Sequence, residues 1–127
     1  MFTHMAVGSN DLAKSKTFYD ALFTAIGSNP GIVDPIKERL IYSHMDRSFM
    51  VTKPINGEPA TFANGGTIGF AMANPEQAAA WHDAGVANGG TSIEDPPGVR
   101  NLAIGGFYLA YLRDPDGNKL CGMCPAA

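Results

Sequence analysis

The spacing of apolar residues predicts a strand followed by a helix at the start of the chain. Residues 2–7 form a short β-prone run, and Ser9-Asn10-Asp11 then supplies polar residues that can cap a helix. From Leu12 onward the apolar residues recur at helical spacing as far as Ile26, beyond which a glycine ends the pattern. We therefore expect a strand, a capped turn and one amphipathic helix.

The pattern beyond this helix predicts a loop, a hairpin and then a break. Residues 29–37 show neither helical nor alternating spacing and read as a loop. Residues 39–44 and 48–52 alternate as two strands that turn at Met45-Asp46-Arg47. Residues 55–66 are rich in Gly, Pro and Asn, a composition typical of a connection between structural units.

The second half of the chain starts the same order again. A strand is predicted at 67–72, and Asn74 caps a helix with Pro at its first turn and a stop at Gly89-Gly90. A proline-rich connection follows. The runs 107–112 and 119–124 then form a hairpin around the tight turn Asp-Pro-Asp-Gly-Asn.

These two halves align as an internal repeat. A shift of 63 positions (67 minus 4) places His4 on Thr67 without gaps through the helix, and a shift of 71 (121 minus 50) places Met50 on Cys121. The alignment predicts one domain over 1–127. Its module 1 covers about 1–55, a linker covers about 56–66, and module 2 covers about 67–127.

Composition and charge narrow the class of protein. The chain has 127 residues with 45% hydrophobic residues, which fits a single globular domain. Its formal net charge of −3 gives no general attraction to nucleic acid or acidic membranes. We expect no membrane span and no nucleic-acid partner. The two cysteines and the lack of a leader-like start favour a cytoplasmic location.

Three segments together resemble the vicinal oxygen chelate superfamily: "FTHMAV", "DLAKSKTFYDALF" and the closing "YLRDPDGNKL". That superfamily includes glyoxalase I, bleomycin-resistance proteins and extradiol dioxygenases. The resemblance covers nearly the whole chain. It implies an α+β fold of two βαβββ modules that form an open, curved-sheet cup, commonly completed by homodimerisation.

The resemblance also implies where a metal would be held. Family members that use a metal bind it through one side chain from the first and one from the last strand of each module. These positions map to His4, Met50, Thr67 and Cys121. The family set consists of His, Glu or Gln, so only His4 is retained as a metal ligand. A single imidazole beside a thioether, a hydroxyl and a thiol does not match a catalytic site for Zn, Ni or Fe.

Strand alternation adds further candidates for the cup. It places Cys121 and Cys124 on opposite faces, which excludes a thioredoxin-like pair of thiols. We expect Cys121 to line the cup. Alternation also allows only one of Tyr108 and Tyr111 into the cup. Arg100, which follows a proline-rich segment, is a candidate partner for an anionic group or simply a surface charge.

The sequence supports two hypotheses about the function of this protein. The favoured hypothesis is a protein that binds a small molecule in the cup, with a degenerate metal site and no cofactor. The alternative is a lyase of the glyoxalase I (lactoylglutathione lyase) type, or a dioxygenase, with a divalent metal (Zn, Ni or Fe) at His4. Whether the chain is an enzyme is left open, because one scaffold supports unrelated chemistries.

Overall fold

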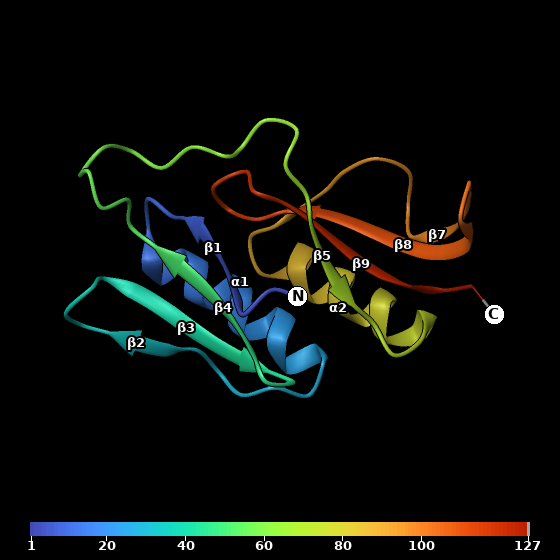
Figure 1. Cartoon of the computed structure of the whole chain (residues 1–127), viewed down its shortest axis with the longest axis horizontal. Helices are drawn as coiled ribbons and strands as arrows, with labels where there is room; N and C mark the ends of the chain where they lie inside the picture. Colours follow the sequence, from blue (N-terminus) through green and yellow to red (C-terminus); the bar gives the residue numbers. More distant parts are fainter. Residues whose placement is uncertain (127) are drawn as a thin grey trace.

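The first module folds as a four-stranded sheet with one helix. The structure is a computed structural model and describes residues 1–126 (Figure 1). In sheet order the strands are β1 (His4–Gly8), β4 (Arg47–Thr52), β3 (Arg39–His44) and β2 (Ile32–Asp34). β1 runs parallel to β4, whereas the other pairs are antiparallel.

The second module repeats this order. Its strands are β5 (Ile68–Ala71), β9 (Lys119–Pro125) and β8 (Gly105–Arg113), followed by β6 (Thr91–Ser92) and β7 (Gly98–Leu102), which both pair with the outer edge of β8. β5 is parallel to β9, just as β1 is to β4. The two short strands together occupy the place of β2. The expected α+β fold of two βαβββ modules with curved sheets is confirmed.

Three short strands escaped the sequence prediction. Residues 29–37 were expected to be a loop, but Ile32–Asp34 pair with β3. β6 and β7 lie within the connection that precedes the closing hairpin. β2 and β6 have only three and two residues, so neither is long enough to show an alternating pattern.

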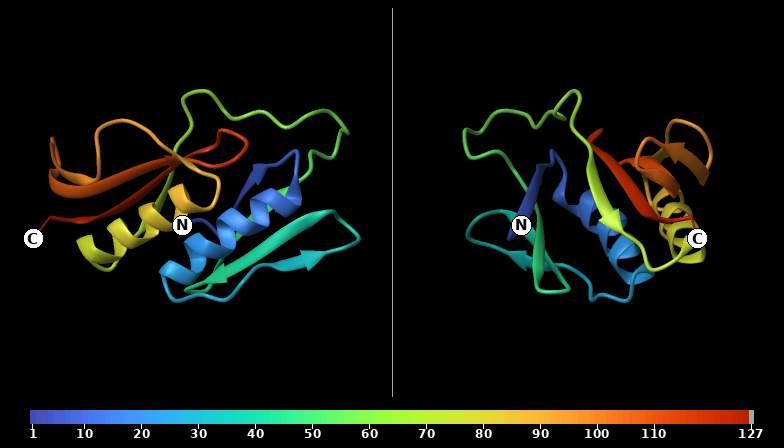
Figure 2. Two further views of the ribbon diagram at one scale, coloured as in Figure 1. Left: turned by 180° about the vertical axis from the view of Figure 1, so that it is seen from behind. Right: turned by 45° about the vertical axis from the view of Figure 1, so that its right-hand side comes forward.

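Both helices begin at side chains that accept a backbone hydrogen bond. α1 (Leu12–Ala25) is capped by Asp11, which accepts from the Lys14 amide at 3.1 Å. α2 (Pro75–Ala87) is capped by Asn74, which accepts from the Gln77 amide at 2.8 Å. The two helices lie on the same side of the molecule, as the view from behind shows (Figure 2). The opposite faces of both sheets are therefore free of helices, and we call them the cup faces.

The two modules share one hydrophobic core between the helices and the sheets. α1 contributes Phe18, Tyr19 and Leu22, and α2 contributes Trp81, all of them buried. Trp81 packs close to the backbone of Gly122 on β9, because a Cβ at that glycine would lie 3.0 Å from the indole ring. The helix therefore approaches the sheet closely at this glycine.

His82, next to Trp81 on α2, is buried rather than exposed to solvent. The residue is only 7% exposed. Its Nε2 lies 2.9 Å from the Ser92 hydroxyl on β6. The short strand β6 covers this side of α2, and its two residues are too few to show an alternating pattern.

The closing hairpin turn joins the second module to the first. The Tyr19 hydroxyl on α1 donates to Asp114 at 2.6 Å, and the Asn118 amide group donates to the Gly8 carbonyl at 3.0 Å. Asn118 also donates to Asp114 at 2.8 Å, so the turn and the first module form one buried network. Within residues 1–126, none of the helices has the length and hydrophobicity needed to cross a membrane.

Candidate functional site

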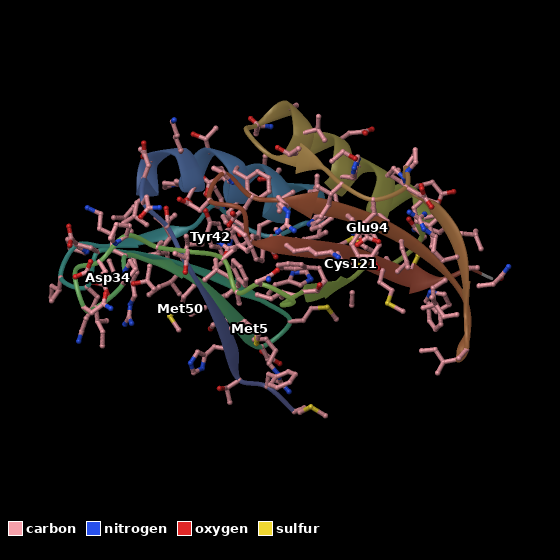
Figure 3. All side chains as sticks on the ribbon, turned by 90° about the horizontal axis from the view of Figure 1, so that it is seen from above. Met5, Asp34, Tyr42, Met50, Glu94 and Cys121 are labelled. Atoms are coloured by element: carbon pink, nitrogen blue, oxygen red, sulfur yellow. The ribbon has the colours of Figure 1, made fainter. Side chains whose placement is uncertain are left out.

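In the first module, His4 and Met50 lie on the cup face of neighbouring strands. The parallel register pairs His4 with Ser48 and Ala6 with Met50. His4 and Met50 are thus diagonal neighbours, two residues apart along the strands. Phe49 and Val51, which alternate with Met50, are buried in the core, so Met50 points away from α1 (Figure 3). The exposed His4 ring has its Nδ1 2.9 Å from the Thr3 hydroxyl.

The second module has the same diagonal relation between Thr67 and Cys121. The register pairs Gly69 with Cys121, and Thr67 stands two residues before that glycine. Thr67 is exposed just ahead of β5, whereas Cys121 is only 5% exposed. The strand pairing therefore places the two pairs of residues at equivalent points of the two sheets.

A groove separates the edges of the two sheets, β1 and β5. Its volume is about 310 Å³, and its lining includes Ala6, Gly8, Thr67 and Lys119 together with part of the linker. Of the four positions that would hold a metal, only Thr67 lines this groove. His4, Met50 and Cys121 lie outside it, so this groove does not bring the four side chains together.

The structure distinguishes between the two candidate tyrosines. Tyr111 pairs directly with Cys121, so both side chains lie on the cup face. Tyr108 pairs with Cys124 on the other face and packs against the hydrophobic core. Of the two candidate tyrosines, Tyr111 is therefore the cup residue and Tyr108 is not. Cys121 and Cys124 are both free thiols on opposite faces, as alternation requires.

Burial keeps both Tyr111 and Cys121 in their neutral forms. It raises the pKa of the Cys121 thiol above its ordinary value, although the neighbouring Tyr111 hydroxyl acts in the opposite direction. Burial likewise raises the pKa of Tyr111, and the adjacent Cys121 adds to this effect. At neutral pH the pair presents an SH and an OH group rather than anions.

Arg100 lies on β7 and is tied to the loop that precedes it. Its guanidinium group donates to the backbone carbonyls of Asp95 at 2.7 Å, Pro96 at 2.9 Å and Gly98 at 3.0 Å. Arg100 pairs with Phe107 of β8, which places its side chain on the cup face. The guanidinium group therefore shapes the loop and also brings a positive charge to this face.

Two charged residues of the site were not identified from the sequence. Glu94, in the loop between β6 and β7, forms an ion pair with Lys119, and the Lys119 ammonium lies 5.0 Å from the centre of the Tyr111 ring. Lys119 stands two residues before Cys121, so strand alternation predicts its face. Glu94 lies in an irregular loop, where its backbone is left-handed (φ 58°). No periodic pattern in the sequence therefore predicts the direction of its side chain.

The donor atoms at the four family positions do not fit a catalytic divalent metal. Such a site needs three good protein ligands and an open position. Here one imidazole is accompanied by a thioether, a hydroxyl and a buried thiol, so two of the four groups are weak metal ligands. Within residues 1–126, no three His, Cys, Asp or Glu side chains are grouped so that they could hold a metal ion.

The chain is similar in sequence and structure to a solved protein. The crystal structure of a glyoxalase/bleomycin resistance protein from Albidiferax ferrireducens T118 is 55% identical over 96% of this chain and 97% of that chain, with a TM-score of 0.92. The chain therefore belongs to the glyoxalase/bleomycin resistance protein family, within the vicinal oxygen chelate superfamily. A scan against protein-family models and a search of the curated proteins returned no match.

More distant structures share the fold. A glyoxalase-related enzyme from Fulvimarina pelagi is 20% identical over 97% of this chain and 86% of that chain, with a TM-score of 0.73. Lactoylglutathione lyase from Agrobacterium tumefaciens is 18% identical over 97% of this chain and 92% of that chain, with a TM-score of 0.67. At these identities the likeness concerns the arrangement of strands and helices.

Proposed function

We propose that the protein binds a small organic molecule on the cup faces of its sheets and does so without a metal ion. The observation that supports this proposal most strongly is the donor set at the four family positions. His4 alone matches the family set of His, Glu or Gln, and Met50, Thr67 and Cys121 supply a thioether, a hydroxyl and a buried thiol. Small residues on β5, namely Gly69 and Ala71, leave room above the sheet for a ligand.

The proposed cup is completed by a second copy of the chain. Because the groove of a single chain does not include His4, Met50 or Cys121, we expect another surface to cover the cup faces and enclose the ligand. A homodimer with two-fold symmetry supplies the same surface twice and closes both cups.

Metal analysis together with thermal unfolding tests the metal-free proposal. Protein purified without a chelating tag is expected to contain less than one tenth of an equivalent of Zn, Ni or Fe, on the order expected for adventitious metal. EDTA is expected to leave the melting temperature unchanged, because no metal-binding free energy supports the folded state.

The opposite result would support the metal-dependent lyase or dioxygenase instead. That result is a fall of several degrees with EDTA that is reversed by Zn, Ni or Fe. A His4→Ala variant then separates specific from adventitious binding, since it removes the retained ligand. Thr3→Val is the matched control, because it replaces only the hydroxyl next to the imidazole by a methyl group and keeps His4.

A further inference from the structure

We infer that the ligand of the cup is an organic anion, with an apolar body and a carboxylate or another oxyanion. This inference rests on the proposed function, because it names the class of ligand for that same cup. Its basis is the charge on the cup face of the second sheet, which carries three cationic side chains and one carboxylate. The cations are Arg100, Arg113 and Lys119, and the carboxylate is Glu94.

The strand register places all three cations on one face. Arg113 pairs with Lys119 at the end of the closing hairpin, and two residues further along Tyr111 pairs with Cys121. Leu112 and Leu120, which alternate with these residues, are buried in the core. Arg100 reaches the same face from β7 through its pairing with Phe107. The loop residue Glu94 reaches it through its ion pair with Lys119, and Glu94 and Cys121 are labelled over this sheet (Figure 3).

The carboxylate balances only one of these charges. Lys119 is paired with Glu94, whereas neither Arg100 nor Arg113 has a carboxylate partner among residues 1–126. Arg113 donates to the Gly117 carbonyl at 2.6 Å and lies over the Phe62 ring, contacts that hold the guanidinium group without neutralising it. This local surplus of positive charge contrasts with the net charge of −3 of the whole chain.

The first sheet shows no such surplus. On its cup face Arg39 forms an ion pair with Asp34 at 3.3 Å, so the two charges balance. A positive concave surface attracts anions and raises their local concentration. Burying an anionic group requires a compensating charge, which guanidinium and ammonium groups provide. The second sheet is therefore where the charged end of the ligand binds.

The same face also offers apolar surface for the rest of the ligand. Met123 and Tyr111 lie on this face and are half-buried, whereas Leu109, which pairs with Met123, is covered. Because the Cys121 thiol and the Tyr111 hydroxyl are uncharged, they do not repel an anion. The expected ligand thus places its apolar body over Met123 and the Tyr111 ring, with its oxyanion near the cations.

Three probes with the same body and different head groups test this class of ligand. They are 4-phenylbutyrate, 4-phenylbutylamine and 4-phenylbutan-1-ol, each titrated into the full chain at low ionic strength with calorimetry and thermal unfolding as readouts. We expect binding and a rise in melting temperature with the carboxylate alone. Its affinity is expected to fall as NaCl is added, because salt screens the attraction.

Paired variants then locate the binding. Glu94→Gln removes the carboxylate and is expected to tighten phenylbutyrate binding by about three- to tenfold, and Lys119→Gln to weaken it by a similar factor, from the Coulomb energy of one charge at this range. Asp83→Asn and Lys14→Gln make the same charge changes on the helices, on the far side of the sheets, where Asp83 is 86% exposed. These controls are expected to change the affinity less than about twofold.

The outcomes separate the two proposals. If the amine or the alcohol binds and the carboxylate does not, the anionic class is overturned while small-molecule binding stands. Carboxylate binding that is unchanged in both Glu94→Gln and Lys119→Gln also overturns the inference, because the anion then binds elsewhere. If none of the three probes binds at millimolar concentration, both the inference and the proposed function are contradicted.

Discussion

Cys121 is the residue of the site that departs furthest from the family pattern. Where the family resemblance implies a His, Glu or Gln, this chain has a thiol that is 5% exposed. A carboxylate here would add a negative charge next to Lys119 and Tyr111. The neutral thiol leaves the positive charge of the second sheet available to a ligand. One substitution therefore weakens the case for a metal and strengthens the case for an anion.

The raised pKa of Cys121 predicts slow alkylation at neutral pH. Iodoacetamide reacts with the thiolate, and burial keeps Cys121 protonated to higher pH than an ordinary thiol. The rate of Cys121 alkylation, followed by mass spectrometry, is therefore expected to keep rising above pH 9. The rate for a free cysteine peptide levels off above its pKa of about 8.5.

Two variants test whether the pH dependence of alkylation belongs to Cys121. Cys124→Ala leaves Cys121 as the only cysteine and is expected to keep the pH profile, whereas Cys121→Ser removes alkylation at position 121 and leaves Cys124, whose pKa burial also raises. A rate at Cys121 that levels off below pH 8 in the folded protein would show that the thiolate is stabilised, and the description of an uncharged cup pair would be wrong.

At the scale of elements, the position of the second sheet depends on how closely α2 approaches β9. Gly122 makes this approach possible, because any Cβ there would lie 3.0 Å and 3.2 Å from two atoms of the Trp81 ring. Cys121 is the next residue along the strand and points to the opposite face. The packing of α2 against β9 therefore determines the distance between the helix and the strand that carries the cup residue Cys121.

Gly122→Ala is expected to destabilise the fold by about 1–3 kcal/mol, because the rigid indole ring must move. Gly69→Ala is the matched control: Gly69 lies on the neighbouring strand β5, and a Cβ there would meet nothing within 4 Å. This control is expected to change the free energy of unfolding by less than about 0.5 kcal/mol. Urea denaturation of both variants measures the difference. Equal stabilities would contradict the close helix–sheet contact.

At the scale of the whole molecule, the surface carries exposed apolar side chains near both ends of the sheets. Phe2 is 63% exposed before β1, Met45 is 81% exposed at the tip of the first hairpin, and Ile104 is 78% exposed at the tip of the β7–β8 hairpin. Single exposed apolar residues are common on monomers. Their occurrence around open sheet faces agrees with a surface that a second chain covers.

The predicted assembly is a homodimer at micromolar concentration. Light scattering coupled to size exclusion is expected to give about twice the chain mass of 13.4 kDa. Met45→Ser tests whether the first hairpin takes part, with Ile36→Ser, 86% exposed on the β2–β3 connection, as a control of similar exposure. A mass near that of one chain at this concentration would count against closure of the cup by a partner.

Several features of this protein were determined by the sequence alone, because they depend on neighbours in the chain. Asp11 and Asn74 cap the helices through local hydrogen bonds, and the Asp114–Asn118 turn closes a hairpin. The internal repeat was also visible, and the strand register agrees with it: His4 and Met50 stand in the same diagonal relation as Thr67 and Cys121. Local periodicity was enough for the two helices and the longer strands in their order, although it missed β2, β6 and β7.

Only the tertiary structure decided which side chains share the site. Alternation separates Tyr108 from Tyr111 but does not say which of them faces the helix, and packing against α2 made that choice. Glu94 reaches Lys119 across 25 residues (119 minus 94) because the loop between β6 and β7 brings it back over the sheet. Such contacts arise from chain folding over long separations, which no local pattern encodes.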